Sequence, residues 1–223
     1  FVCVLAGCDR ASLSQAAPPA KPPEKLVLKD KTFVAWVTVA NLTQKGGSVL
    51  TLENPGGVFD ALVFAEYQSA KWMLGSDFGR RCHRDQSAWP AETADPATLV
   101  QVAVCFRGRE VSIYRNAKLS ASYRMATDPI AFSQTSTVLM GLRHVDAGRP
   151  TCFFSGTIED ARIYDTALEA PTLASLKPNK PGGPKPFAWW SFESPKAEDA
   201  MGRFPPARLV DGATISGGKL HLP

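Results

Sequence analysis

An alternation of apolar and polar residues late in the chain constrains the fold more than any other feature of the sequence. From Gly156 onward, Ile158, Ala161 and Ile163 are interleaved with polar residues, and Asp165 ends the run. A period of two is typical of a strand that has one buried face. The same alternation recurs between turns rich in Gly, Pro and Asn. The further segments are residues 32–39, 48–52, 61–65, 71–74, 99–106, 110–114, 119–123 and 137–142.

These segments predict an all-β fold. We expect residues 26–176 to form a two-sheet antiparallel sandwich, with helix confined to a short tail within 167–176. Two stretches around this unit are rich in Pro, which predicts a tether at 9–25 and a linker at 177–186. The linker has no large apolar side chain. Residues 187–223 then form a further β segment.

The charge balance argues against a nucleic-acid partner. The 223 residues include 25 Lys and Arg against 21 Asp and Glu, a net charge of +4. The basic residues are scattered apart from Arg80, Arg81 and Arg84, as on a solvated surface. No run approaches the ~20 apolar residues that a membrane span requires.

Three motifs, in this order, resemble those of one family. They are TFVAWV at 32–37, LVQVAVCF at 99–106 and GTIEDARIYDTAL at 156–168. The chain resembles the LamG-like, concanavalin A-like lectin/glucanase jelly rolls, although Glu159-Asp160 replaces the usual Asp-Glu and Asn116-Ala117 replaces a turn that is usually Asp-Gly. The resemblance implies an all-β, two-sheet antiparallel jelly roll, a fold that mostly serves sugar recognition or adhesion.

Jelly rolls of this family usually begin with a strand before the first motif. That strand has no full counterpart here, because only Leu26-Val27-Leu28 precedes the motif. The segment 187–222 resembles that missing opening. Either it pairs back onto the same sandwich, or it opens a second, truncated domain or leads into a catalytic one. If it pairs back, one of Trp189 and Trp190 is buried and its neighbour is more exposed, because alternate residues of a strand share a face.

The N-terminus resembles a bacterial lipobox, since an apolar run ends in Leu5-Ala6-Gly7-Cys8. This reading makes 1–8 a partial lipoprotein signal peptide and Cys8 a lipidated residue. It places the protein in the bacterial cell envelope, lipid-anchored and periplasmic or surface-exposed, with membrane contact only through the anchor. The alternative is a buried N-terminal strand with a chance Gly-Cys pair.

The cysteines leave the redox state open. Cys3 would leave with the signal peptide, so that Cys82, Cys105 and Cys152 form at most one disulfide or remain three reduced thiols. Their spacing does not select a pair, and no Cys/His pattern indicates a zinc site.

Catalytic patterns are missing from the sequence. Glucanases of this fold place acidic residues on alternate positions of one strand, whereas Glu159 and Asp160 are adjacent and point to opposite faces. Glu92 and Asp95 lie in a loop with Pro residues. His83, His144 and His221 are far apart in sequence and lack a nucleophile elbow. Asp146, Asp160 and Asp165 hint at calcium, but we expect no cofactor and name no metal ligand.

Sugar binding requires aromatic platforms and a few polar groups. The candidate glycan-binding residues are Tyr67, Trp72, Arg80, His83, Trp89, Arg143 and His144. We therefore expect a non-catalytic carbohydrate-binding or adhesion module, with a glycan or cell-surface polysaccharide as its partner and a glycoside hydrolase as one context. The alternatives are a glycoside hydrolase fragment whose catalytic domain lies beyond the C-terminus, and a ligand-free spacer in which Trp72 is core and the loop is only solvated.

Overall fold

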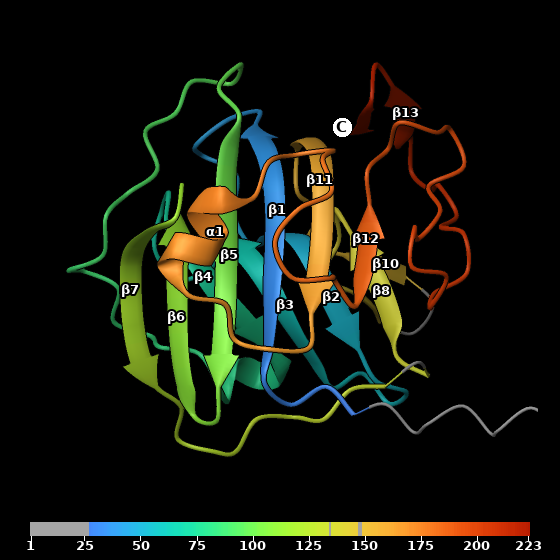
Figure 1. The fold of residues 1–223 in the computed structure, drawn as a ribbon. Helices are drawn as coiled ribbons and strands as arrows, with labels where there is room; N and C mark the ends of the chain where they lie inside the picture. Colours follow the sequence, from blue (N-terminus) through green and yellow to red (C-terminus); the bar gives the residue numbers. More distant parts are fainter. Residues whose placement is uncertain (1–26, 134, 147–148) are drawn as a thin grey trace, which may run out of the picture.

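The computed structural model describes residues 27–133, 135–146 and 149–223, in which two antiparallel sheets pack face to face (Figure 1). The larger sheet contains β1 (Lys31–Val39), β5 (Val100–Arg107), β6 (Glu110–Arg115), β7 (Lys118–Arg124), β11 (Gly156–Tyr164), β12 (Ala188–Trp190), β13 (Thr214–Ser216) and β14 (Lys219–Leu222). The smaller sheet contains β2 (Gly47–Glu53), β3 (Phe59–Phe64), β4 (Trp72–Ser76) and β8 (Thr137–Met140). A separate hairpin joins β9 (His144–Asp146) to β10 (Arg149–Thr151).

The strand order confirms the predicted sandwich. It is β13-β14-β11-β1-β5-β6-β7 in the larger sheet, with β12 also paired to β11, and β4-β3-β2-β8 in the smaller one. Every segment expected to be a strand is one. β8 stops at Met140, short of the expected 142, because Gly141 has a φ of 78° and leaves the extended conformation. The β9–β10 hairpin carries no comparable alternation and was not predicted.

β1 explains why both faces of the first motif carry bulky side chains. It lies between β11 and β5, and all nine of its residues are buried. Phe33 and Val37 belong to the core between the sheets, whereas Val34 and Trp36 belong to a second cluster on the outer face of the larger sheet. A central strand covered on both sides has no solvent-facing positions.

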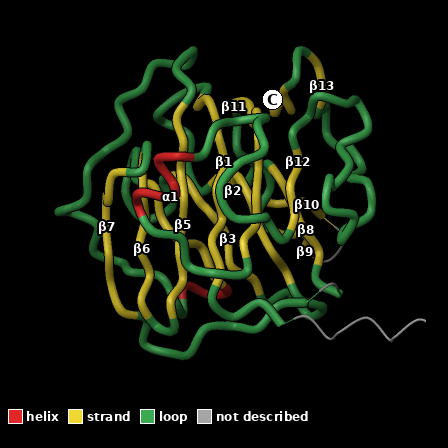
Figure 2. The backbone as a smooth tube through the Cα atoms, in the orientation of Figure 1, coloured by secondary structure: helices red, strands yellow, loops and turns green. Residues whose placement is uncertain are grey.

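The outer cluster is covered by α1 (Ala170–Ser175), which crosses the front of the larger sheet in Figure 1. Leu173 and Leu176 pack there beside Trp36 and Tyr164. Pro171 occupies the first turn, where its missing N–H costs no helical bond. In the described residues the helical elements are α1 and a 3₁₀ turn, η1 (Asp77–Gly79), and Figure 2 colours helices red. Neither helix in the described residues is long and apolar enough to cross a membrane.

Residues 177–186, the segment predicted as a linker, are bonded to β11. The buried Arg162 donates hydrogen bonds to the carbonyl oxygens of Lys177 and Lys180, at 2.8 and 3.1 Å. The amide of Asn179 donates to Asp160 Oδ2 at 2.7 Å. The side chains of Lys177 and Lys180 remain exposed, so these two residues attach the segment through their backbone groups.

The tail beyond this segment belongs to the larger sheet. β12 pairs with β11 through Ala161↔Trp190 and Ile163↔Ala188, and β14 pairs with the beginning of the same strand. Trp190 is buried and Trp189 is half-buried, as alternate facing requires. The Trp189 indole donates to Asp160 Oδ2 at 2.9 Å. In this structure the tail thus covers the side of the sandwich that the short N-terminal segment leaves open.

Candidate functional site

The connection from β4 to β5 builds the candidate site. It leaves β4 through η1 and lies against the smaller sheet, where Tyr67, Cys82 and Trp89 pack on the cluster formed by Phe59, Ala61, Val63 and Met73. This places residues 77–89 and Tyr67 on the outer side of β3 and β4.

A buried arginine fixes this connection. Arg81 bonds to Asp60 Oδ1 at 2.9 Å, to the carbonyl oxygen of Phe59 at 2.7 Å and to Asp77 Oδ1 at 2.7 Å. Lys31 from β1 lies 3.0 Å from Asp60 Oδ2. The four charged groups alternate in sign within the interior, where unpaired charges would be costly.

Further hydrogen bonds hold the middle of the connection. Gln86 is buried and donates to Met73 Sδ at 3.2 Å and to the His83 carbonyl at 3.1 Å. The Tyr123 hydroxyl, from β7, donates to the Arg81 carbonyl at 2.9 Å. The segment is therefore held at several points, and side chains that project from it have a rigid base.

Three aromatic rings meet beside this base. The ring centroid of His83 lies 5.7 Å from Trp89 and 5.3 Å from Tyr123, and Trp89 and Tyr123 are 6.0 Å apart. His83 is exposed, and Trp89 and Tyr123 are half-buried. The structure therefore brings together two of the predicted residues, His83 and Trp89, with a third ring that the sequence did not single out.

A second group of side chains continues the surface. The Arg84 guanidinium lies 5.6 Å from the Tyr67 ring centroid. A Cβ on Gly79 would lie 2.1 Å from the Tyr67 hydroxyl oxygen, which leaves room there only for glycine, and Gly79 also has a φ of +67°. Burial raises the pKa of Tyr67, so its hydroxyl stays protonated at neutral pH and can both donate and accept.

Phe78 is the most exposed aromatic residue on this surface. Its side chain is 89 % exposed with a backbone φ of 49°, and the Arg80 guanidinium lies 5.9 Å from its ring centroid. A positive φ is strained for a bulky residue, and it turns the ring away from the core. We call the surface formed by Tyr67, Phe78, Arg80, His83, Arg84 and Trp89 the aromatic–basic face.

Two of the residues predicted to bind a ligand are held inside the fold. Trp72 is 5 % exposed and its indole donates to Glu92 at 2.8 Å. Arg143 is 8 % exposed and bonds to Glu66 at 2.6 Å and to the Gly46 carbonyl. A ligand on the surface does not reach either side chain, so both are withdrawn as ligand contacts.

His144 is half-buried and comes from the β9–β10 hairpin, not from the β4–β5 connection. It stacks on Phe59, with ring centroids 5.5 Å apart. Sequence reasoning missed Phe78, Arg84 and Tyr123. The signal for Phe78 was its position between Asp77 and Gly79, a loop setting in which an aromatic side chain has little reason to be buried.

The buried carboxylates are structural. Glu92 accepts bonds from Arg115, Trp72 and the amides of Thr93 and Ala94. Burial alone would raise the pKa of Glu92, but these donors outweigh it and lower the pKa to about 2. A carboxyl group that stays ionised at neutral pH cannot serve as a general acid.

Asp160 is likewise saturated, by Arg162 at 2.9 and 2.8 Å and by the donors from the tail. Arg162 itself lies between the rings of Trp36 and Trp189, 5.1 and 4.7 Å from their centroids. In the part of the chain that the structure describes, no three His, Cys, Asp or Glu residues gather as metal ligands. Cys82, Cys105 and Cys152 are all unpaired there.

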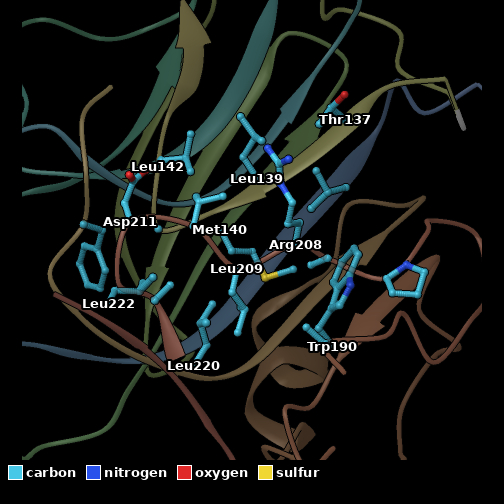
Figure 3. A pocket seen from close by; sticks show the side chains of 18 of the residues that line it. Thr137, Leu139, Met140, Leu142, Trp190, Arg208, Leu209, Asp211, Leu220 and Leu222 are labelled. Atoms are coloured by element: carbon cyan, nitrogen blue, oxygen red, sulfur yellow. The ribbon is translucent and has the colours of Figure 1, made fainter. Parts of the chain in front are cut away.

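A cavity of about 730 Å³ lies at the opposite edge of the smaller sheet. It is lined by β8, Phe154, Trp190, β14 and residues 204–211. Figure 3 shows Met140, Leu209, Trp190 and Leu220 around it. Apart from Arg208, Asp211, Ser136 and Thr137, the side chains around it are apolar. Because β4 and β8 are opposite edges of the sheet, this cavity and the aromatic–basic face are separate sites.

Comparison with known proteins agrees with this fold. The family model of the concanavalin A-like lectin/glucanases superfamily matches residues 16–174, and the chain belongs to that family. No curated protein matches the chain.

The solved structures that are similar to this chain include the following two. One is a putative carbohydrate binding protein from Bacteroides ovatus, at 16 % identity and a TM-score of 0.58, over 82 % of this chain and 52 % of that one. The other is domain 4 of AbnA, a GH43 extracellular arabinanase from Geobacillus stearothermophilus, in complex with arabinotriose, at 18 % identity and a TM-score of 0.52, over 66 % of this chain and 65 % of that one. At these identities the likeness establishes the fold. The chain spans about half the length of the first of them.

Proposed function

We propose that this domain is a non-catalytic carbohydrate-binding module and that its glycan lies on the aromatic–basic face. The observation that carries the proposal is Phe78, an aromatic ring 89 % exposed beside the Arg80 guanidinium, in a connection whose other exposed side chains include His83 and Arg84. Exposed aromatic rings provide the apolar platform on which the C–H face of a sugar stacks, and nearby donors bind its hydroxyl groups.

The rigidity of the face supports the same conclusion. The buried bonds of Arg81 and Gln86 fix the backbone that carries Phe78, His83 and Arg84. Little conformational entropy is then lost when a ligand orders these side chains, which favours affinity for weakly binding sugars. The two similar structures, one titled a putative carbohydrate binding protein and one bound to arabinotriose, are in keeping with this role.

A non-catalytic role follows from how the acidic residues are used. Glu92 and Asp160 are saturated by cationic and neutral donors. Neither is free to act as the nucleophile or the acid that a glycosidase requires. Within this proposal the domain is an accessory module of an envelope protein, and the enzyme that it would assist is a glycoside hydrolase.

The test is a glycan array followed by calorimetric titration of the best oligosaccharide. We expect Phe78→Ala to weaken binding about tenfold, because an aromatic contact contributes ~0.5–1.5 kcal/mol beyond its buried area. Phe153→Ala is the matched control, since Phe153 is also an exposed aromatic residue, at 49 %, and it lies by the cavity at the other sheet edge. Unchanged affinity in Phe78→Ala would overturn the site. If the domain binds no glycan on the array, the proposed function is refuted in favour of a ligand-free spacer.

We also propose that Cys8 carries a diacylglycerol anchor and that the protein resides in the bacterial cell envelope. The support is Leu5-Ala6-Gly7-Cys8 followed by the Pro-rich 9–25 segment; these residues lie outside those that the structure describes. Expression of the gene in a lipoprotein-competent host should give an N-terminal mass that carries diacylglycerol at Cys8, and Cys8→Ser should abolish it. An unmodified N-terminus that retains residues 1–7 would refute the anchor.

A further inference from the structure

We propose that the 730 Å³ cavity between β8 and the tail binds an amphiphile of the fatty-acid class, with its carboxylate on Arg208 and its hydrocarbon chain inside. This site is separate from the aromatic–basic face, and the proposal does not depend on glycan binding.

The volume and the lining of the cavity point to a ligand. Small-molecule sites typically measure ~300–1,000 Å³ and are lined by apolar side chains with a few polar groups. Here Met140, Trp190, Leu220 and Leu222 face a common space (Figure 3). Such a lining offers hydrocarbon contacts and almost no hydrogen-bond partners for sugar hydroxyl groups.

The cavity also opens to solvent. Phe153 and Leu209 at its border are 49 % and 40 % exposed, which is unusual for large apolar side chains in this protein. A ligand that covers them would remove apolar surface from water and gain stability from it. The cavity is therefore accessible without unfolding of the sandwich.

Arg208 supplies the polar end. Its side chain is exposed and extends toward Leu139 in Figure 3, while Asp211 lies on the other side of the cavity. Among the described residues, Arg208 has no carboxylate partner. A guanidinium beside an apolar cavity is well suited to a ligand that joins a carboxylate to a long apolar chain, because both groups bind at once.

A peptide strand added to the outer edge of β8 is the rival occupant. The edge of the added peptide that does not pair with β8 would face residues 204–210. There Pro205 and Pro206 have no N–H to donate, and the other side chains are mostly apolar. Buried peptide groups left without partners are costly. A hydrocarbon chain carries no such groups, so the lining favours the amphiphile.

The probe is sodium dodecanoate below its micellar concentration, titrated by calorimetry into the whole chain. We expect saturable binding, and from octanoate to dodecanoate the Kd should fall about fourfold for each added methylene, as hydrocarbon burial predicts. Arg208→Gln should weaken dodecanoate about tenfold and leave 1-dodecanol unaffected. Met140→Trp should weaken both probes, because Met140 faces the apolar space and the larger ring would fill it.

Lys196→Gln is the matched control. It removes the same charge from the same tail, at a residue whose side chain is 73 % exposed and away from the cavity lining. Equal affinities in Arg208→Gln and Lys196→Gln, a Kd independent of chain length, or no saturable binding would overturn the proposal. Size-exclusion chromatography tests the rival occupant: a dimer that Met140→Trp abolishes and dodecanoate leaves intact would assign this edge to a second copy of the chain.

Discussion

Trp190 tests whether the tail is an integral part of the sandwich. Its side chain is 1 % exposed, and its ring centroid lies 5.9 Å from that of Phe204. Truncation of a buried tryptophan to alanine costs ~3–5 kcal/mol. Because Trp190 also borders the 730 Å³ cavity, water can enter the vacated space. We therefore expect Trp190→Ala to lower the free energy of unfolding by about 3 kcal/mol, the lower end of that range.

The assay is differential scanning calorimetry of the whole chain. A loss of about 3 kcal/mol lowers the Tm of a domain of this size by about 6–12 °C. Leu119→Ala is the control, since Leu119 is 59 % exposed and its truncation should change stability by no more than ~0.5 kcal/mol. If the main transition of Trp190→Ala stays within about a degree of the wild type, the tail folds as a separate unit and this reasoning is refuted.

Three further predictions concern single residues. The pKa of Glu92 is lowered from 4.5 to about 2, so the ionised group stabilises the fold by on the order of 3 kcal/mol above pH ~4.5, and this stabilisation is lost as the pH falls toward 2. In acid titrations monitored by circular dichroism, Glu92→Gln should therefore lose less stability than the wild type over that range. An equal loss in both proteins would contradict the assignment. Ala117 has a φ of 59°, so Ala117→Gly should raise stability by about 0.5–1 kcal/mol in thermal melts; an unchanged or lower Tm would show that the turn is not strained. Gly79→Ala should cost at least about 1 kcal/mol more than Gly108→Ala, because both have positive φ but only Gly79 faces the Tyr67 hydroxyl; equal losses in urea titrations would mean that Tyr67 is not packed there.

The sequence predicted the strands because their signal is local. Ile158, Ala161 and Ile163 alternate with polar residues whatever the tertiary context, and the larger sheet uses that alternation directly. The turn at Asn116-Ala117 was harder, because Ala117 is a poor residue for a type I′ turn, yet both residues have positive φ, 48° and 59°. The strand pairing on each side outweighs the local preference.

The candidate site was less predictable, because it depends on which face of each element is covered. Trp72 lies in a short strand whose alternation does not reveal which side faces the second sheet. The structure places it against Phe64, with ring centroids 4.7 Å apart, inside the core. Phe78 is the opposite case, an apolar residue that no layer covers.

Residues 177–186 illustrate a further limit. Their composition correctly indicates a segment without apolar anchors, but the bonds that fix it come from backbone carbonyl and amide groups. Backbone groups are the same in every sequence. Their buried partners, Asp160 and Arg162, appeared in the sequence only as polar members of an alternating strand.

The way the tail is attached has a consequence for the topology of the chain. β12 and β14 meet β11 through inter-strand pairs, and Asp160 and Arg162 hold the segment between the helix and β12. Lys180 and Lys185 in that segment are exposed, so a protease could cut the backbone there and leave both pieces docked. In the intact chain, the covalent link serves mainly to keep the tail at a high effective concentration beside β11. We therefore expect the body and the tail of this domain, expressed separately, to reassemble as a split protein.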